Sequence, residues 1–561
     1  MKRKTLIILS ICTVFLGTTT VFANGDSATV PSIEKHEKES YFKSQKPHPV
    51  FTWNSTVIPV SSVLHSGSPR GAGMEAAPLE KIDQIMDQAI ADKVMPGAVA
   101  FVARGGKIVK HSAYGYSAQY VDGKLTEMEH PIPMKEDTIF DLASISKIFT
   151  AVSVMKLYEK GLFQLDDPVA KYIPEFAQNG KEHVTIRQLL THTSGFTAWI
   201  PLYTQGKSRA DRLQLVFEQP LKNPPGTAYE YSDLNMITLG ALVERLSGQR
   251  EDVFVKENIT VPLGMKDTMY NPPSSLKNRI AATEYQSTPN RGLVWGVVHD
   301  ENAWSLDGVA GHAGVFSTAE DLAKLAHIFL NDGKYGGARI LEPATVKLLL
   351  ENQNEAFPGN DHGLGWELGQ SWYMDALSEG TYSFGHTGYT GTSIVVSPNN
   401  KTIAILLTNR VHPSRRTVST NQTRRLFARQ VADSIPVSIP GNGSAWFAGY
   451  GDKLSREMEA DLQLKEDAKL TFATWHRIED GWDYGYVEAF IDGSWEKLDG
   501  CTGVSSGWEN VELTIPKAAT KLRFVYQTDS SANGRGWYVL NPKLNSEALN
   551  LTKNDWELRD Y

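Results

Sequence analysis

The sequence predicts a mixed α/β (α+β) domain, with an antiparallel sheet and an inserted all-α lobe, followed by an all-β sandwich domain. Strand-like segments occur on both sides of a long, mainly helical region that extends to about residue 330. A Pro- and Gly-rich stretch at 434–443 then precedes a tail of short alternating runs. A sheet assembled from both ends of one domain, with helices inserted between its strands, accounts for the first pattern.

Composition narrows the classes of function. The chain has 561 residues, of which 41% are hydrophobic and 21% charged, as is typical of a folded globular protein. The net charge of −8 argues against a nucleic-acid partner held through phosphate contacts. The two cysteines exclude a disulfide framework, and no Cys/His cluster has metal-ligand spacing. We therefore expect no metal and no cofactor.

The N-terminus has the pattern of an export signal. Basic residues at positions 2–4 precede an apolar run, Leu6–Leu16, that is too short to span a bilayer. Val21 and Ala23 suit a signal-peptidase site, so a signal peptide is expected at 1–23. We expect a secreted, extracellular or cell-wall-associated protein with no membrane span after cleavage. An uncleaved N-terminal anchor is the alternative.

The mixed domain is expected at 66–433, after a polar N-terminal tether at 24–65. A helical period begins at Pro78, and a buried strand follows at Ala98–Arg104. A Gly-Gly turn then returns the chain as the second strand of a hairpin. The other end of the domain supplies further strands and a closing helix: Tyr382–Thr390, Ser393–Ser397, Ile403–Thr408 and Arg416–Ala432.

The C-terminal part differs in character from the rest. A linker is expected at 434–443, and residues 444–561 contain seven of the 13 tryptophans. Short alternating runs such as Leu470–Trp475 and Leu522–Tyr526 indicate antiparallel strands separated by Gly-containing turns. We expect a separate β-sandwich accessory domain.

One candidate nucleophile opens a helix. Ser144 and Lys147 lie three residues apart, so both side chains face the same side near the helix N-terminus. A serine hydroxyl needs a base within hydrogen-bond reach, and a lysine amine of lowered pKa can serve as one. An isolated Ser-x-x-Lys is more often a surface serine, because the pattern also occurs elsewhere in this chain.

Two further motifs strengthen the first. Tyr231-Ser232-Asp233 leads into an apolar helix, and His386-Thr387-Gly388 lies on a strand. With Ser144 and Lys147 they follow the order of the three motifs of penicillin-recognising serine hydrolases. The chain resembles the serine β-lactamase and penicillin-binding protein-like family, in its class C β-lactamase, DD-peptidase and esterase branch. The resemblance covers about residues 66–433 and implies a β-lactamase/transpeptidase-like fold.

The resemblance implies a role for each motif residue. Ser144 would be the acylated nucleophile, and Lys147 and Tyr231 would share proton transfer. The backbone N–H groups of Ser144 and Tyr389 would form the oxyanion hole. The remaining motif residues would bind substrate: Asp233, His386, Thr387 and Gly388.

Two motif residues depart from the family pattern. The second motif usually ends in Asn, where this chain has Asp233, and the third usually begins with Lys, where it has His386. A neutral imidazole lacks the positive charge that a lysine offers to a substrate carboxylate. Both changes weaken the case for efficient β-lactam turnover and leave the nucleophile and its base intact.

Two further likenesses bear on substrate and partners. His299–Ala303 resembles a stretch of secreted bacillar N-acetylmuramyl-L-alanine amidases, and His299 with Asp300 could either line the cleft or belong to an ordinary loop. The tryptophan-rich tail resembles the β-sandwich of immune-inhibitor-A-type peptidases but lacks their metal-binding motif. Its aromatic faces could bind cell-wall glycan, although most tryptophans in a sandwich are core residues.

These features predict a secreted serine hydrolase that forms an acyl-enzyme on Ser144. Its expected substrates are amide bonds of cell-wall-derived peptides or muropeptides, cleaved as a MurNAc-L-Ala amidase or a D-alanyl peptidase. The alternatives are an esterase or weak β-lactamase of the same family, acting on an ester or β-lactam. A non-catalytic penicillin-binding or wall-binding sensor is the alternative from another class.

Overall fold

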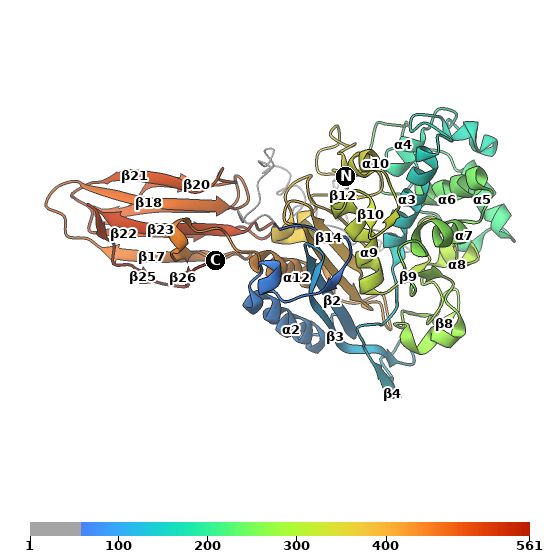
Figure 1. Ribbon diagram of the computed structural model, residues 1–561, viewed down its shortest axis with the longest axis horizontal. Coiled ribbons are helices and arrows are strands. Elements are labelled where there is room, and N and C mark those ends of the chain that lie inside the picture. Colours follow the sequence, from blue (N-terminus) through green and yellow to red (C-terminus); the bar gives the residue numbers. More distant parts are fainter. Residues whose placement is uncertain (1–57) are drawn as a thin grey trace, which may run out of the picture.

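The computed structural model describes residues 58–561 and shows a mixed domain followed by a β-sandwich (Figure 1). The expected signal peptide at 1–23 and the tether as far as residue 57 lie outside the described residues. The last part of the expected tether packs on the mixed domain, because Ser61 N donates to Gly105 O and β1 (His65–Ser66) pairs with the sheet. The predicted fold class is confirmed.

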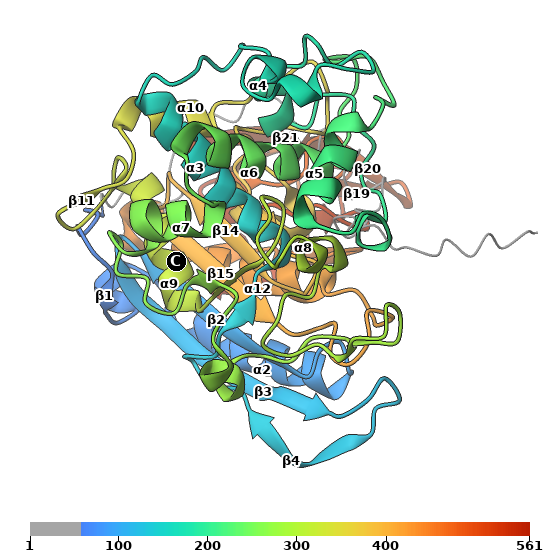
Figure 2. The same ribbon diagram turned by 90° about the vertical axis from the view of Figure 1, so that its right-hand side faces the viewer.

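The main sheet has the strand order β1-β3-β2-β15-β14-β13-β12, with β4 paired to β3. Its other strands are β2 (Gly97–Arg104), β3 (Lys107–Tyr120), β4 (Glu127–Pro133), β12 (Glu367–Leu368), β13 (Phe384–Thr387), β14 (Ser393–Ser397) and β15 (Thr402–Thr408). The antiparallel pair β2 and β15 joins the two ends of the domain, with Phe101 opposite Ile405. Figure 2 shows the β3–β4 hairpin extending past the body of the domain. The sheet is thus assembled from both ends of the domain.

Helices cover both faces of this sheet (Figure 1). On one face α2 (Ala76–Ala91) packs against α12 (Asn421–Asp433), with Leu79, Ile82 and Met86 buried. On the other face α9 (Ala319–Leu330) contacts β15 and β2. The central strands β2, β14 and β15 are therefore buried along their whole length, which explains the continuous apolar run of β15.

The inserted lobe is mainly helical and surrounds α3 and α6, which pack on each other (Figure 2). Its helices are α3 (Ser146–Glu159), α4 (Ile186–Leu190), α5 (Arg209–Glu218), α6 (Asp233–Ser247), α7 (Glu251–Val255), α8 (Glu301–Ser305) and α10 (Pro343–Leu350). The short helix α11 (Ser371–Met374) packs on α12 instead. The short strands β5 (Phe140–Asp141), β6 (Met269–Tyr270) and β9 (Val315–Ser317) form a small sheet beside α3. Two small hairpins complete this domain: β7 (Tyr285–Gln286) with β8 (Gly292–Leu293), and β10 (Lys334–Tyr335) with β11 (Ala338–Arg339).

Central helices of this kind need apolar residues on every side, because each side faces other protein groups. In α3 the residues from Ser146 to Met155 are all buried, and most of α6 is buried as well. Within residues 58–561, no helix combines the length and the apolar character that a bilayer crossing would require.

The C-terminal domain consists of two antiparallel sheets. One contains β16 (Ala445–Phe447), β18 (Ala468–Arg477), β21 (Glu509–Ile515), β23 (Gly536–Leu544), β24 (Glu547–Ala548) and β26 (Glu557–Arg559). The other contains β17 (Ser455–Asp461), β19 (Tyr484–Ile491), β20 (Ser494–Cys501), β22 (Lys521–Gln527) and β25 (Thr552–Lys553). Buried and half-buried residues alternate along β19, as expected when one face of the sheet covers a core.

The sandwich is joined to the mixed domain by a shared core rather than by a free linker. Val437 and Ile439, in the stretch expected as a linker, are buried with Val431 of α12 and Tyr538 of β23. Arginine–carboxylate pairs add to this contact, since Asp433 at the end of α12 pairs with arginines of the sandwich. The two domains therefore share one continuous hydrophobic core.

Candidate active site

Ser144 lies in a tight turn between β5 and α3, in the 3-10 helix η2 (Ala143–Ile145). Ala143 has a φ of +47°, and its N–H donates to Asp141 Oδ1 at 2.9 Å. The other Asp141 oxygen accepts from the His299 backbone N–H at 2.6 Å, which ties the turn to the opposite wall. Ser144 is 7% exposed. The turn thus presents the hydroxyl at the N-terminus of α3.

Lys147 is one turn further along and is almost fully buried. Its Nζ donates to Ser144 Oγ at 2.8 Å and to the His312 carbonyl oxygen at 3.2 Å. The same Nζ lies 2.8 Å from Asp233 Oδ1, and both side chains of this ion pair are at most 2% exposed. The predicted nucleophile and its predicted amine partner are therefore in direct contact.

Tyr231 is brought to Ser144 by the segment that leads into α6. The Lys147 ammonium lies 4.8 Å from its ring centroid, and the His192 ring packs at 4.6 Å on the phenol. Burial first, and then the Asp233 carboxylate, raise the pKa of Tyr231 well above its usual range, while the nearby Ser144 acts to lower it. Tyr231 is consequently an uncharged phenol at neutral pH.

His192 has a structural place beside this tyrosine. Its Nδ1 accepts from the Ser232 backbone N–H and from the Asn235 amide, both at 3.1 Å. Burial lowers the pKa of His192 well below its usual value, so the ring is neutral. The neutral ring therefore fixes the second motif and the start of α6.

The third motif is buried, with His386 and Thr387 at the end of β13 and Gly388 directly after it. The Nδ1–H of His386 donates to the Thr387 carbonyl oxygen at 2.7 Å. Burial, and next the nearby Lys147 charge, lower the pKa of His386 to about 3. His386 is therefore neutral, and it does not provide a cation for a substrate carboxylate. Thr387 is 1% exposed.

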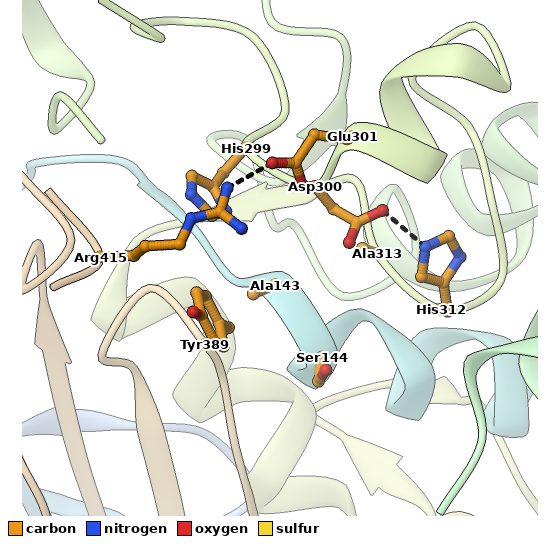
Figure 3. Close-up of a pocket in the computed structure, with 9 residues that line it drawn as sticks. All are labelled: Ala143, Ser144, His299, Asp300, Glu301, His312, Ala313, Tyr389 and Arg415. Atoms are coloured by element: carbon orange, nitrogen blue, oxygen red, sulfur yellow. Dashed lines mark hydrogen bonds and ion pairs between the residues drawn. The ribbon is translucent and has the colours of Figure 1, made fainter. Parts of the chain in front are cut away.

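A pocket opens beside Ser144 (Figure 3). It is lined by Ala143, Ser144, His299, Asp300, Glu301, His312, Ala313, Tyr389 and Arg415. Ser144 and Tyr389 border the same space, as a shared oxyanion hole requires, and that role of their N–H groups stays a prediction. His299 and Asp300, for which the sequence left two interpretations open, line the pocket. Asp233, His386, Thr387 and Gly388 do not line it.

Ion pairs hold the wall opposite Ser144. His299 Nε2 lies 3.0 Å from Glu284 Oε2, Arg415 contacts both Glu284 and Glu301, and His312 Nε2 lies 2.8 Å from Asp300 Oδ1. Burial acts to raise the pKa of Glu284, but His299 and Arg415 lower it to about 2. The Glu284 carboxylate is therefore ionised throughout the neutral range.

Sequence reasoning missed Glu284, Glu301 and Arg415. Glu284 and Arg415 lie outside every motif recognised in the sequence, whereas Glu301 begins α8 within the His299–Ala303 stretch, where no role was expected for it. Arg415 and Glu284 are 131 positions apart, so no local pattern could have paired them.

Gly388, in the third motif, has no room for a side chain. A Cβ there would lie 2.1 Å from Thr392 Oγ1 and 2.3 Å from the Leu142 carbonyl oxygen. We expect Gly388→Ala to displace the adjacent Tyr389 backbone and lower kcat by about 100-fold, as the loss of an oxyanion-hole donor does. Steady-state kinetics would measure this. Gly337→Ala, where a Cβ meets nothing within 4 Å, is the matched control. Equal kcat in the two variants would contradict the prediction.

Comparisons with known proteins agree with this geometry. The family model described as Beta-lactamase matches residues 82–429. An Escherichia coli K12 protein named "Putative D-alanyl-D-alanine carboxypeptidase" is 34% identical over 382 residues, covering 62% of this chain and 86% of its own length. A protein of the same name from Salmonella agona is 32% identical over 381 residues, covering 62% and 87%.

Two solved structures share the fold of the mixed domain. EstCE1, a hydrolase with promiscuous acyltransferase activity, is 20% identical with a TM-score of 0.52, covering 64% of this chain and 99% of that one. A class C β-lactamase is 18% identical with a TM-score of 0.51, covering 64% and 96%. At these identities the likeness establishes the fold alone.

Proposed function

Because the chain belongs to the β-lactamase family of serine hydrolases, we propose that it is an exported enzyme that cleaves amide bonds of cell-wall-derived peptides or muropeptides. The reaction passes through an acyl-enzyme on Ser144. The bond cleaved is either the one between N-acetylmuramic acid and L-alanine or a D-alanyl peptide bond.

One observation carries the proposal. Lys147 Nζ lies 2.8 Å from Ser144 Oγ in a site where the lysine is 1% exposed. A hydroxyl in contact with a buried amine is the arrangement that activates a serine for nucleophilic attack. Structural serines on a surface have no such partner.

The step is an ordinary acyl transfer. Ser144 Oγ forms a bond to the substrate carbonyl carbon, and its proton passes to Lys147. The carbonyl oxygen becomes an oxyanion that the N–H groups of Ser144 and Tyr389 would stabilise. The carbon–nitrogen bond then breaks, and the leaving amine takes the proton back. Water repeats the sequence on the ester and releases Ser144.

The substrate class is supported by a wide cleft that continues from the pocket. The cleft shares Glu301 and Arg415 with the Ser144 pocket, and its other lining residues include Trp199, Tyr203 and Arg416. Trp199 and Tyr203 have ring centroids 6.4 Å apart, and such aromatic faces suit a sugar. The exposed Arg416 offers a cation for a peptide carboxylate. The carboxypeptidase name of the Escherichia coli relative also supports a peptide substrate.

The test is a substrate comparison with the purified chain from residue 24. N-acetylmuramyl-L-alanyl-D-isoglutamine, a peptide ending in D-Ala-D-Ala and a short-chain nitrophenyl ester are each incubated with wild type and Ser144→Ala. Mass spectrometry follows release of N-acetylmuramic acid and D-alanine. Release from either amide substrate by wild type alone supports the proposal. Ester cleavage without amide cleavage would instead favour the esterase alternative.

We further propose that the sandwich binds wall glycan through its outer sheet face. Trp475, Trp537 and Trp556 are each 2% exposed and belong to the core. Tyr484 and Tyr486 instead lie half-buried on the outer face, with parallel rings 5.4 Å apart. Parallel aromatic rings of this kind can stack on sugar rings.

Sedimentation of the full chain with purified peptidoglycan tests this binding surface. Replacing both tyrosines with alanine is expected to weaken binding about tenfold. Tyr382→Ala, which changes an exposed tyrosine of the mixed domain, is the matched control. Unchanged sedimentation of the double variant would contradict the proposed surface.

A further inference from the structure

The surroundings of Lys147 Nζ indicate which charge state the lysine has at rest. Three acceptors lie around the nitrogen: Ser144 Oγ at 2.8 Å, Asp233 Oδ1 at 2.8 Å and the His312 carbonyl oxygen at 3.2 Å. An ammonium has three N–H donors, one for each acceptor. A neutral amine could accept from the Ser144 hydroxyl and still donate twice, but it would leave the buried Asp233 carboxylate without a counter-charge. The contacts therefore match a charged lysine.

Asp233 supplies the counter-charge. Its carboxylate is buried, and neither oxygen has a hydrogen-bond partner among the described residues apart from this ion pair. A buried charge without a partner is costly, so the Lys147 ammonium and the Asp233 carboxylate each need the other close by. An asparagine, the usual residue at this position of the family motif, would offer Lys147 an acceptor without a charge.

The other titratable groups around the pair do not replace Asp233. These groups are Tyr231, His192, His386, and His312 with its partner Asp300. His192 and His386 are neutral because burial lowers the pKa of each ring. Asp300 is paired with His312, whose carbonyl rather than its ring contacts Lys147. Within residues 58–561, Asp233 is the carboxylate that pairs with Lys147.

Tyr231 is also unsuited to accept the first proton. Its burial, with Asp233 next to it, disfavours the phenolate by raising the pKa of Tyr231 well above 10. Among the described residues, Asp233 is therefore the base in contact with the Lys147 ammonium. The proton of Ser144 needs a route to that carboxylate.

We propose that Asp233 is the proton acceptor of this site, acting through Lys147. The proposal rests on the acyl-enzyme at Ser144 described above and adds a role that substrate binding does not include. Asp233 touches no reacting atom, so it is a positioning residue for Lys147 that also stores the proton.

The step balances in protons and electron pairs. Lys147 gives one N–H proton to Asp233 Oδ1, which becomes a neutral carboxyl group. The freed lone pair on Nζ takes the proton of Ser144 as Oγ bonds to the carbonyl carbon. When the oxyanion collapses, the leaving group takes a proton from Lys147, and Asp233 returns its proton to Nζ. The pair holds one proton at the start and one at the end.

This proton relay, from Ser144 through Lys147 to Asp233, predicts how the reactivity of Ser144 depends on pH. In the wild type, reactivity is lost at acid pH only when the Asp233 carboxylate itself becomes protonated. In Asp233→Asn, Lys147 must instead lose its proton to solvent before it can accept one. The acid limb of the variant's pH profile is therefore expected at higher pH than that of the wild type.

The experiment measures labelling of the full chain by a serine-directed fluorophosphonate, from about pH 5 to about pH 10. This readout follows Ser144 reactivity without knowledge of the natural substrate. At about pH 6 the Asp233→Asn rate is expected to fall about 100-fold, and the gap should close toward alkaline pH. Asp321→Asn, which changes a partly buried lysine–carboxylate pair formed with Lys324 at 2.7 Å, is the control and should keep the wild-type profile.

Asp233→Glu is the second variant. It keeps a carboxylate, so its acid limb should lie with that of the wild type even if the rate at every pH is lower. Coincident acid limbs in wild type and a folded Asp233→Asn would overturn the relay while leaving the nucleophile in place. Loss of Asp233→Asn labelling at every pH would also overturn it. Absence of wild-type labelling would instead remove the proposed nucleophile and the relay together.

Discussion

Ser144→Ala is expected to lower the hydrolysis rate of every substrate of this enzyme by about four orders of magnitude or more. The hydroxyl is the atom that Lys147 contacts at 2.8 Å, and alanine has nothing that can form the acyl bond. Steady-state assays on amide and ester substrates would measure the loss. Fluorophosphonate labelling should disappear in parallel.

The stability of this variant separates catalysis from folding. The substitution removes one oxygen atom from a side chain at the pocket surface, so unfolding should change by about 1 kcal/mol or less. Thermal unfolding of both proteins supplies the comparison. Equal hydrolysis by wild type and a folded Ser144→Ala would show that the chemistry takes place elsewhere and would favour the non-catalytic sensor.

Asp433→Ala is expected to destabilise the protein by about 3–5 kcal/mol, because it leaves buried arginines without their counter-charge. Asp433 lies 3.1 Å from Arg535 and 2.7 Å from Arg559, and the Asp433 and Arg535 side chains are 0% exposed. These residues join α12 of the mixed domain to β26 and the segment before β23. Urea unfolding, followed by tryptophan fluorescence, would measure the change in the free energy of unfolding.

The effect should depend on pH in a defined direction. Burial alone would raise the pKa of Asp433, but Arg535 and Arg559 lower it below its usual value. The stabilisation is therefore fully present above the ordinary pKa of about 4 and is lost as the pH falls through the lower folded value. The difference between wild type and Asp433→Ala should shrink in acid.

An exposed pair provides the control for this comparison. Lys469 and Glu512 lie 2.7 Å apart with side chains 56% and 63% exposed. Glu512→Ala should cost about 1 kcal/mol or less, because solvent screens such a pair. A similar loss in both variants would contradict a special role for the buried pair.

The three catalytic motifs could be found in the sequence because each is local. Ser144 and Lys147 lie within one helical turn, and His386 and Thr387 are adjacent on one strand, so short-range spacing already places the residues of each motif close together. The shared sheet could also be predicted, since strand patterns occur at both ends of the domain. The two ends of the domain come into contact through the pairing of β2 with β15.

The partners of these residues could not be predicted in the same way. Whether Asp233 faces the substrate or Lys147 depends on how α6 packs against α3, which no local pattern encodes. The stretch expected as a linker is likewise Pro- and Gly-rich, yet Val437 and Ile439 are buried between two domains. The composition of a segment indicates its local backbone preference, whereas the burial of its side chains depends on which distant parts of the chain pack against it.

The sequence by itself determined the family, the fold class and the identity of the nucleophile and its amine, because these depend on short spacings and on hydrophobic period. Only the tertiary structure decided the charges of the site. Burial lowers the pKa of His386 to about 3, so its ring is neutral, and the fold places the Asp233 carboxylate 2.8 Å from Lys147. The physical reason is that a charge state depends on burial and on neighbours from distant parts of the chain, which only the folded packing brings together.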